Sequence, residues 1–170
     1  MRFLIDGYNL MYAGGLLGKR LGPEAFRRVR NRFLNQLSDA LGPLDAHQTT
    51  VVFDAASAPA GVPDVGSHKG LSVVFAIDDE TADDRIEDLI RHHSHPRSLT
   101  VVSSDRRIRE TASRRRATAI TSERFWVSLD ARRDRRVVAG KAGRVALPES
   151  TPNRVDPDLS AEDAAHWLAT

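Results

Sequence analysis

The stretch FLIDGYNLM, residues 3–11, decides how the fold is interpreted, because an apolar run stops there at polar residues. The run is typical of a short buried strand, which we predict over residues 2–6. The strand ends at Asp6, and the amide Asn9 follows three residues later. Such an ending is typical either of a capped strand end or of the floor of a functional site. The residues that follow the other predicted strands distinguish between these two interpretations.

Strands and helices alternate along the rest of the chain. Apolar residues at helical spacing, with Pro23 in the first turn and Gly42 just past the end, predict a helix over residues 23–41. Further helices are expected at residues 79–93 and after Asp105. Strands are expected at residues 48–54, 71–77, 99–104 and 117–121. This alternation predicts an α/β fold with a parallel sheet covered by helices on both faces.

The length of 170 residues suits one domain with a full core, which we expect to cover residues 1–136. From residue 137 the apolar periodicity fades into a segment rich in Gly, Pro and polar residues. Residues 137–170 are therefore expected to form an irregular tail. A capping box at Ser160 and Asp163 predicts a short helix at its end, with Trp167 available to pack on the domain.

The composition excludes several classes of protein. Hydrophobic residues make up 41% of the chain and charged residues 28%, which is typical of a soluble globular domain. The sequence contains no cysteine, which excludes disulfides, zinc–thiolate sites and a thiol nucleophile, and which fits a reducing cytoplasm. No apolar run approaches the roughly 18 residues of a membrane span, and no signal peptide is evident. We expect a cytoplasmic protein without a membrane partner.

Charge is unevenly distributed, although the formal net charge is only +2. Residues 106–136 contain eleven arginines and four acids, whereas seven acids gather within residues 78–88. A basic surface beside an acidic cluster is typical of a protein that attracts phosphates and holds a metal ion. The alternative is a solvated surface that is simply rich in arginine.

Acidic residues follow several of the predicted strands. Because ligands bind outside the carboxyl ends of parallel strands, we expect Asp6, Asp54 and Asp105 at one edge of the sheet. Helical geometry places Asp83 at the margin of the buried stripe of its helix and Asp84 toward solvent. Clustered carboxylates repel one another unless a cation neutralises them, and oxygen ligands suit Mg²⁺ or Mn²⁺. The sequence therefore predicts a metal site that includes Asp6, Asp83 and Asp105.

Each of these acids also has a structural interpretation. Asp105 is well placed as a helix N-cap, Asp83 as a favourable charge in a first helical turn, and Asp54 as a turn residue. Together they favour the metal site.

Other chemistries fit the sequence less well. The stretch GGLLGKR, residues 14–20, has the wrong spacing for a phosphate-binding loop, and Arg20 stands where a Ser or Thr is required. No glycine-rich dinucleotide motif follows the first strand, and Ser103 and Ser104 have no evident histidine partner for a catalytic triad. A carboxylate-held metal ion that hydrolyses phosphodiesters is the best-fitting chemistry.

Four motifs, in order and spacing, resemble the YacP-like branch of the NYN domains, which are relatives of the PIN nucleases. The motifs are DGYNL at residues 6–10, VVFDA at 51–55, ETADDRIEDLI at 80–90 and VVSSDRRIRETA at 101–112. The resemblance implies a PIN-like three-layer sandwich, with a central and mostly parallel sheet between helices. It also implies an endoribonuclease that depends on Mg²⁺ or Mn²⁺. The catalytic residues implied by position are Asp6, Asn9, Asp83 and Asp105, with Asp54 and Ser104 in support.

RNA, free or in the ribosome, is the partner that this interpretation implies. We expect the RNA backbone to be held by basic side chains near the acids and in the loop before residue 71, namely Lys69, Arg106, Arg107 and Arg109. Aromatic residues are only 6% of the chain, and Tyr8 and Tyr12 are the best placed to stack on bases.

Two other functions stay open at this stage. One is a PIN-like module that binds RNA or a ribonucleoprotein without cutting it. The other is a metal-dependent phosphohydrolase that acts on DNA flaps or small phosphoesters. The sequence also leaves the RNA target, the number of metal ions and the oligomeric state open.

Overall fold

A six-stranded sheet in the order β3-β4-β2-β1-β5-β6 forms the centre of the molecule. The computed structural model describes residues 1–18, 21–55, 64–77 and 81–142, with side chains as far as residue 135. The strands are β1 (Phe3–Asp6), β2 (Thr49–Asp54), β3 (Val65–His68), β4 (Leu71–Ala76), β5 (Thr100–Val102) and β6 (Thr118–Ile120). All neighbouring strands pair in parallel except β3, which pairs with β4 in antiparallel fashion.

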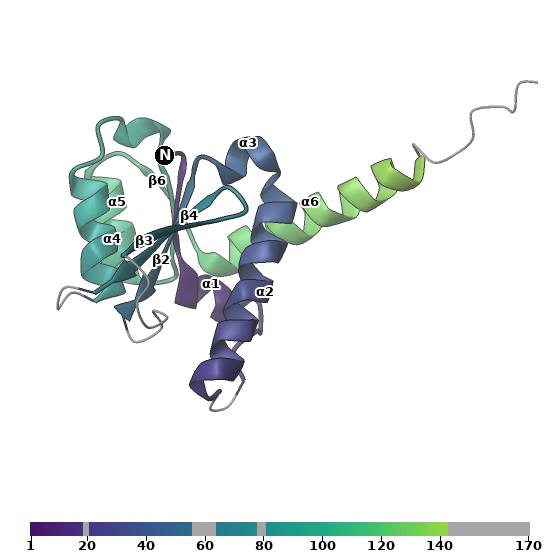
Figure 1. Cartoon of the computed structure of the whole chain (residues 1–170). Coiled ribbons are helices and arrows are strands. Elements are labelled where there is room, and N and C mark those ends of the chain that lie inside the picture. The colour runs from purple at the N-terminus through teal and green to yellow at the C-terminus, as the bar shows by residue number, and fades with distance from the viewer. Residues whose placement is uncertain (19–20, 56–63, 78–80, 143–170) are drawn as a thin grey trace, which may run out of the picture.

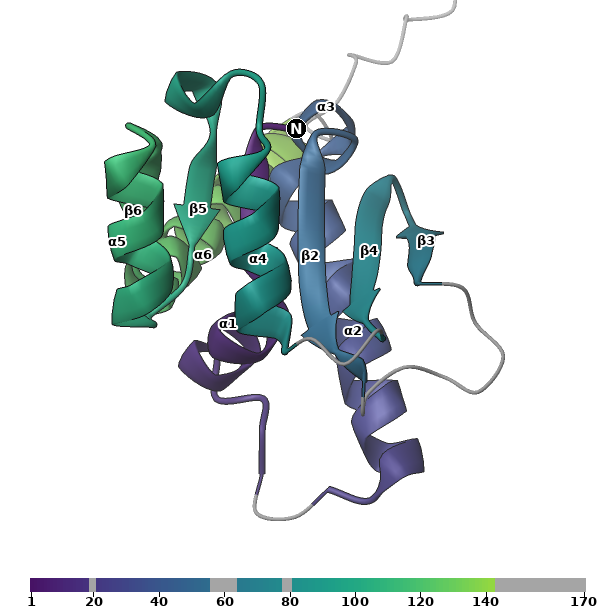
Figure 2. The same ribbon diagram turned by 90° about the vertical axis from the view of Figure 1, so that its left-hand side faces the viewer.

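Helices cover both faces of the sheet. They are α1 (Gly7–Ala13), α2 (Pro23–Leu41), α3 (Pro43–Ala46), α4 (Ala82–Arg91), α5 (Arg106–Arg114) and α6 (Ser122–Ala142), with a short 3₁₀ turn at Pro96–Ser98. Figures 1 and 2 show α4 and α5 on one face and α1, α2 and α6 on the other. The predicted three-layer α/β architecture with a mostly parallel sheet is confirmed.

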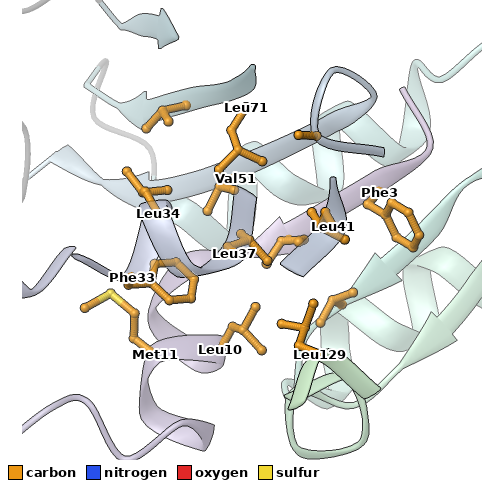
Figure 3. Close-up of a cluster of buried hydrophobic side chains, with 14 of the residues drawn as sticks. Phe3, Leu10, Met11, Phe33, Leu34, Leu37, Leu41, Val51, Leu71 and Leu129 are labelled. Carbon is orange, nitrogen blue, oxygen red and sulfur yellow. The ribbon is translucent and has the colours of Figure 1, made fainter. Parts of the chain in front are cut away.

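The alternation of side chains along β1 separates the two cores. Phe3 and Ile5 point into the cluster beneath α1, α2 and α6, which Figure 3 shows with Leu10, Phe33 and Leu37. Leu4 points into the second cluster, which α4 and α5 cover with Ile86, Ile90 and Ile108. A strand buried on both faces is apolar at every position, which explains the sequence of residues 3–5.

Helix α1 differs from what the sequence suggests, which is a loop after Asp6 that contains Asn9 and in which Gly7 allows a tight turn. The structure instead begins a helix at Gly7, and the Asp6 side chain caps it by accepting from the backbone N–H of Asn9. A Cβ atom at Gly7 would lie 2.4 Å from Cε1 of Phe53. Glycine is needed there because α1 packs closely on the ring of a β2 residue.

Two further differences concern β3 and α6. Strand β3 is a short, polar edge strand that turns into β4 through Lys69 (φ 46°) and Gly70 (φ 86°), and its pattern is too weak to predict. Helix α6 continues to Ala142 and so passes through the expected domain boundary at residue 136. The expected tail helix with Trp167 lies outside the described residues. None of the helices described here is long and apolar enough to cross a membrane.

Candidate active site

The acidic residues gather at the carboxyl edge of the sheet, where the strand order reverses. The chain runs from β1 to β2 and β4 on one side and then returns to β5 on the other side of β1. Asp6 ends β1, Asp54 ends β2, and Asp105 begins the helix that follows β5. The carboxyl ends of β1 and β5 thus flank a topological switch point, where open parallel sheets bind ligands.

Asp6 is the buried centre of this edge, with only 3% of its surface exposed. Its Oδ1 accepts from the backbone N–H of Asn9 at 2.9 Å, and its Oδ2 accepts from the Asn9 amide and from the Ser103 hydroxyl, the latter at 3.0 Å. Burial raises the pKa of the Asp6 carboxyl and repulsion by Asp54 adds to the rise, whereas the bonds from Asn9 and Ser103 oppose it. These three hydrogen bonds fix the orientation of the carboxylate, and they do not use the full acceptor capacity of its two oxygens.

Asp83 shares its surroundings with three other acids. Burial is the main cause that raises the pKa of Asp83, followed by repulsion from Asp6, Asp105 and Asp54, while Arg107 acts in the opposite direction. Its neighbour Asp84 instead forms an ion pair with Arg107 at 2.7 Å. The structure therefore separates the two adjacent acids as helical geometry predicts, with Asp83 facing the acidic edge.

Asp54 and Asp105 each use an oxygen to fasten a helix to this edge. Asp54 Oδ1 accepts from the backbone N–H of Ala82 at 2.8 Å, which ties the start of α4 to the end of β2. Asp105 Oδ1 accepts from the N–H groups of Arg107 and Ile108, so Asp105 is also the N-cap of α5. The structural interpretation of Asp105 as an N-cap is thus correct, whereas Asp54 ties a strand to a helix and is not a turn residue.

Two hydroxyls follow β5, and they have different hydrogen-bond partners. Ser103, which was not among the expected site residues, is fully buried; it donates to Asp6 and accepts from the N–H of Asp105 at 3.0 Å. Ser104 faces away toward α6, where it donates to the carboxylate of Glu123 and accepts from the N–H of Ser122. Ser103 therefore links two of the acids, whereas Ser104 links the edge to Glu123.

Glu123 is an acid of this region that the sequence did not single out. It lies in the first turn of α6, and hydrogen bonds from its own backbone N–H, Ser104 and Thr121 lower its pKa. Its signal in the sequence is an acid at the start of the helix after β6, the same position relative to a strand that Asp105 has after β5.

Comparison with known proteins identifies the family. The model of the YacP-like NYN domain matches residues 3–167, which is nearly the whole chain. The chain belongs to the YacP-like NYN domain family. The resemblance found in the four sequence motifs is thereby confirmed, and the family, with its PIN-like fold of the nuclease type, supports a function of the ribonuclease type.

Solved structures support the fold assignment. The crystal structure of a single-substitution mutant of Rae1 (YacP) from Bacillus subtilis is similar with a TM-score of 0.64, 23% sequence identity and coverage of 85% of each chain. A second structure of Rae1 (YacP) from Bacillus subtilis is similar with a TM-score of 0.54 and 23% identity, covering 86% of this chain and 87% of that one. A search of curated proteins found no match.

The basic residues expected to bind RNA do not form one group in this NYN domain. Arg107 pairs with Asp84 and with the buried Glu87, both at 2.7 Å, and so joins α5 to α4. Lys69 precedes β4 and therefore lies at the opposite, amino edge of the sheet, 3.7 Å from Asp39. Arg106 and Arg109 remain near the acids, because they stand in the first turns of α5 after Asp105.

An open hollow of about 710 Å³ lies against this part of α5. Its lining consists of Arg106, Arg109, Glu110, Ser113, Arg114 and Ala119. Glu110 pairs with Arg106 at 2.7 Å, so the lining carries three arginines against one acid. A net positive hollow that begins beside the acidic edge is suited to the phosphates of a nucleic acid.

The acids of the NYN domain offer the donors that a hard cation prefers. Asp6, Asp83 and Asp105 provide carboxylate oxygens, and repulsion among them raises the pKa of Asp83, an effect that a bound cation would reverse. Within the described part of the chain, no three His, Asp or Glu side chains are already close enough to form a complete ligand set. Carboxylate oxygens are nevertheless the type of donor that suits a hard cation such as Mg²⁺ or Mn²⁺.

Proposed function

We propose that this protein is a metal-dependent endoribonuclease that hydrolyses phosphodiester bonds of RNA. The observation that carries the proposal is the placement of Asp6, Asp54 and Asp105 at or just after the carboxyl ends of β1, β2 and β5, at the switch point of a PIN-like fold, where repulsion from these acids adds to burial in raising the pKa of Asp83. Such a cluster of like charges destabilises the fold unless it serves to bind a cation. The family assignment supports the same class of function.

Asp6, Asp83 and Asp105 would hold the cation, which is Mg²⁺ or Mn²⁺. When bound, such an ion supplies a more acidic water for attack on the phosphorus and neutralises charge on the phosphate. The residues of the chain keep the acids in place. Asn9 and Ser103 orient the Asp6 carboxylate through three hydrogen bonds, and Asp54 holds the helix that carries Asp83.

The substrate is held by the arginine-lined hollow beside the acids. Arg106, Arg109 and Arg114 would contact the RNA backbone, because guanidinium groups bind phosphate oxygens with paired N–H donors. Arg107 has a different task in this proposal: its ion pairs with Asp84 and Glu87 join the helix of Asp105 to that of Asp83. The ribosome remains a candidate for the particle that presents the RNA.

The test is cleavage of an end-labelled single-stranded RNA, alone and within isolated ribosomes, in Mg²⁺, Mn²⁺ or EDTA. We expect cleavage by the wild type with either metal ion, none in EDTA, and a loss of more than about 100-fold in rate for Asp83→Asn. Asp84→Asn is the matched control, since it removes an adjacent carboxylate that faces Arg107. It should cleave at nearly the wild-type rate, because Arg107 keeps its ion pair with Glu87 and so still joins the two helices. Binding of RNA without cleavage under every condition would instead identify a binding module.

A further inference from the structure

The aromatic side chains of this protein are almost all used in its core. The chain has six phenylalanines, two tyrosines and two tryptophans, and of these only Trp167 lies outside the described residues. The buried rings are Phe3, Phe33, Phe53, Phe75 and Phe125. Phe26, Tyr8 and Trp126 are partly buried against the same core. The remaining ring is that of Tyr12, and it stands apart from this set.

Tyr8 and Tyr12, the two residues considered for base stacking, have opposite environments. The ring of Tyr8 stacks on Phe26 with centroids 5.3 Å apart and meets Phe53 edge-on at 6.2 Å, so its faces are occupied by the core. Tyr12 is 75% exposed. Single exposed apolar residues are common on proteins, so the exposure of Tyr12 carries weight only through its position.

The position of Tyr12 follows from α1. This helix begins directly after Asp6, at the carboxyl edge of β1, and Asn9 in its first turn hydrogen-bonds to Asp6. Residues three apart on a helix share a face, with Cβ atoms about 5–6 Å apart. Tyr12 is therefore one turn beyond both Tyr8 and Asn9, on the side of α1 that lies between the core-facing ring of Tyr8 and the Asn9 side chain at the acidic edge.

We propose that Tyr12 is a stacking platform for an RNA base next to the cleaved bond, and that it makes the enzyme prefer single-stranded RNA with an unpaired base at that position. The inference rests on the proposed nuclease function and adds the feature of the substrate that the site recognises. An exposed ring can stack on any base without a hydrogen-bond code, so it selects for an unstacked nucleotide rather than for a sequence. Base-paired RNA keeps its bases stacked on one another and cannot use the platform.

The experiment measures KM and kcat for wild type, Tyr12→Ala and Tyr12→Phe. One substrate is an intact single-stranded RNA. The others have the same sequence but carry one abasic nucleotide, placed in turn at each position that flanks the cut. Tyr12→Ala should raise KM on the intact RNA roughly 10-fold while kcat stays within about twofold, because stacking on an aromatic ring contributes to binding of the base. Tyr12→Phe keeps the ring and should retain the wild-type KM. At one abasic position, wild type and Tyr12→Ala should become equal.

The matched control is Leu44→Ala, which removes an apolar side chain that is 81% exposed on α3, before the start of β2. It should leave KM and kcat unchanged on every RNA. A Tyr12→Ala protein with the wild-type KM on intact RNA, or one whose defect persists at every abasic position, would overturn the stacking role and leave the nuclease function standing. If wild type cuts none of the RNAs, the nuclease function fails and the stacking role fails with it.

Discussion

The charged residues at the two edges of the sheet are arranged in opposite ways. At the amino edge, acids and bases pair: Asp45 accepts from Arg2 at 2.7 Å and from Arg132 at 3.1 Å. At the carboxyl edge, acids face acids, and Asp83 is repelled by Asp6, Asp105 and Asp54. The same sheet thus ends in neutralised charge on one side and in concentrated negative charge on the other.

This contrast separates charges that hold the fold from charges that are available for chemistry. Partly exposed ion pairs such as those of Asp45 each contribute up to about 1 kcal/mol to stability. A cluster of like charges does not stabilise the fold in this way. Its mutual repulsion lowers the stability of the folded state until a cation binds. Substitutions at the two edges should therefore have different consequences, one in stability and the other in activity.

The largest expected effect comes from exchanging one acid at each edge. Asp6→Asn should lower kcat for RNA cleavage by more than about 100-fold, because it removes a proposed metal ligand and disturbs the bonds from Asn9 and Ser103. Asp45→Asn should leave kcat unchanged and lower the free energy of unfolding by about 1 kcal/mol. Cleavage assays and urea denaturation on both variants measure the two effects. A cleaving Asp6→Asn protein would show that the carboxyl edge is not the active site.

The next effect concerns the glycine that lets α1 begin directly after Asp6. Gly7→Ala places a Cβ 2.4 Å from the Phe53 ring and should lower the free energy of unfolding by about 1–3 kcal/mol, because the core must shift to admit it. Gly18→Ala is the control: a Cβ there meets nothing within 4 Å, and stability should change by less than about 1 kcal/mol. Equal denaturation midpoints for the two variants would contradict the packing role of Gly7.

Much of the fold could be predicted from local pattern. Helix α2 begins and ends where its proline, its apolar spacing and Gly42 indicate, and the apolar runs of β2 and β4 are found within a residue of their expected ends. Helix α1 could not be predicted in this way. Its first residue is a glycine that is a poor helix former in isolation, and the reason for it is a contact with Phe53, which is distant in sequence.

A residue of the candidate site could be predicted when its own type and its place in a strand or helix were enough to identify it. Acids at strand ends and the inward side of α4 mark Asp6, Asp105 and Asp83. Ser103 is different, because its partner depends on register: Ile5 is opposite Val102, so the next residues, Asp6 and Ser103, meet across the strands. A single sequence does not contain that register. The sequence therefore singled out Ser104 as a supporting residue but not Ser103, whose hydroxyl is the one that contacts Asp6.

A smaller effect should distinguish the basic residues of the two edges. Arg109→Gln removes a cation from the hollow beside the acids. The slope of log affinity for RNA against log salt concentration should therefore become smaller in magnitude by about 1, the value for one lost phosphate contact. Lys69→Gln, at the amino edge, should leave the slope unchanged. Fluorescence anisotropy with a labelled RNA in EDTA at several salt concentrations measures both. An equal change in the two variants would mean that RNA does not follow α5.

The smallest expected effect concerns how the stability of the protein changes with pH. The contributions of two adjacent acids, Asp83 and Asp84, should change with pH in opposite directions. The pKa of Asp83 is raised above its ordinary value of 3.8, mainly by burial and then by repulsion, so the folded state binds this proton more tightly than the unfolded state does. The stabilisation from that proton is complete below pH 3.8 and is lost as the pH rises through the raised pKa. At neutral pH without metal, Asp83→Asn should therefore be more stable than wild type, and the difference should vanish on acidification.

Asp84 provides the opposite case. Hydrogen bonds from Arg107 and Thr81 lower its pKa below 3.8, so its stabilisation is present above that value and is lost as the pH falls through the lowered pKa. Asp84→Asn should thus be less stable than wild type at neutral pH. Urea denaturation in EDTA between about pH 2 and pH 8 measures both variants, and repeating it with Mg²⁺ at neutral pH should stabilise wild type more than Asp83→Asn, because only the former keeps the full set of acids for the ion. If both variants shift in the same direction, the charge of Asp83 is not opposed by its neighbours, and the carboxyl edge would resemble the amino edge after all.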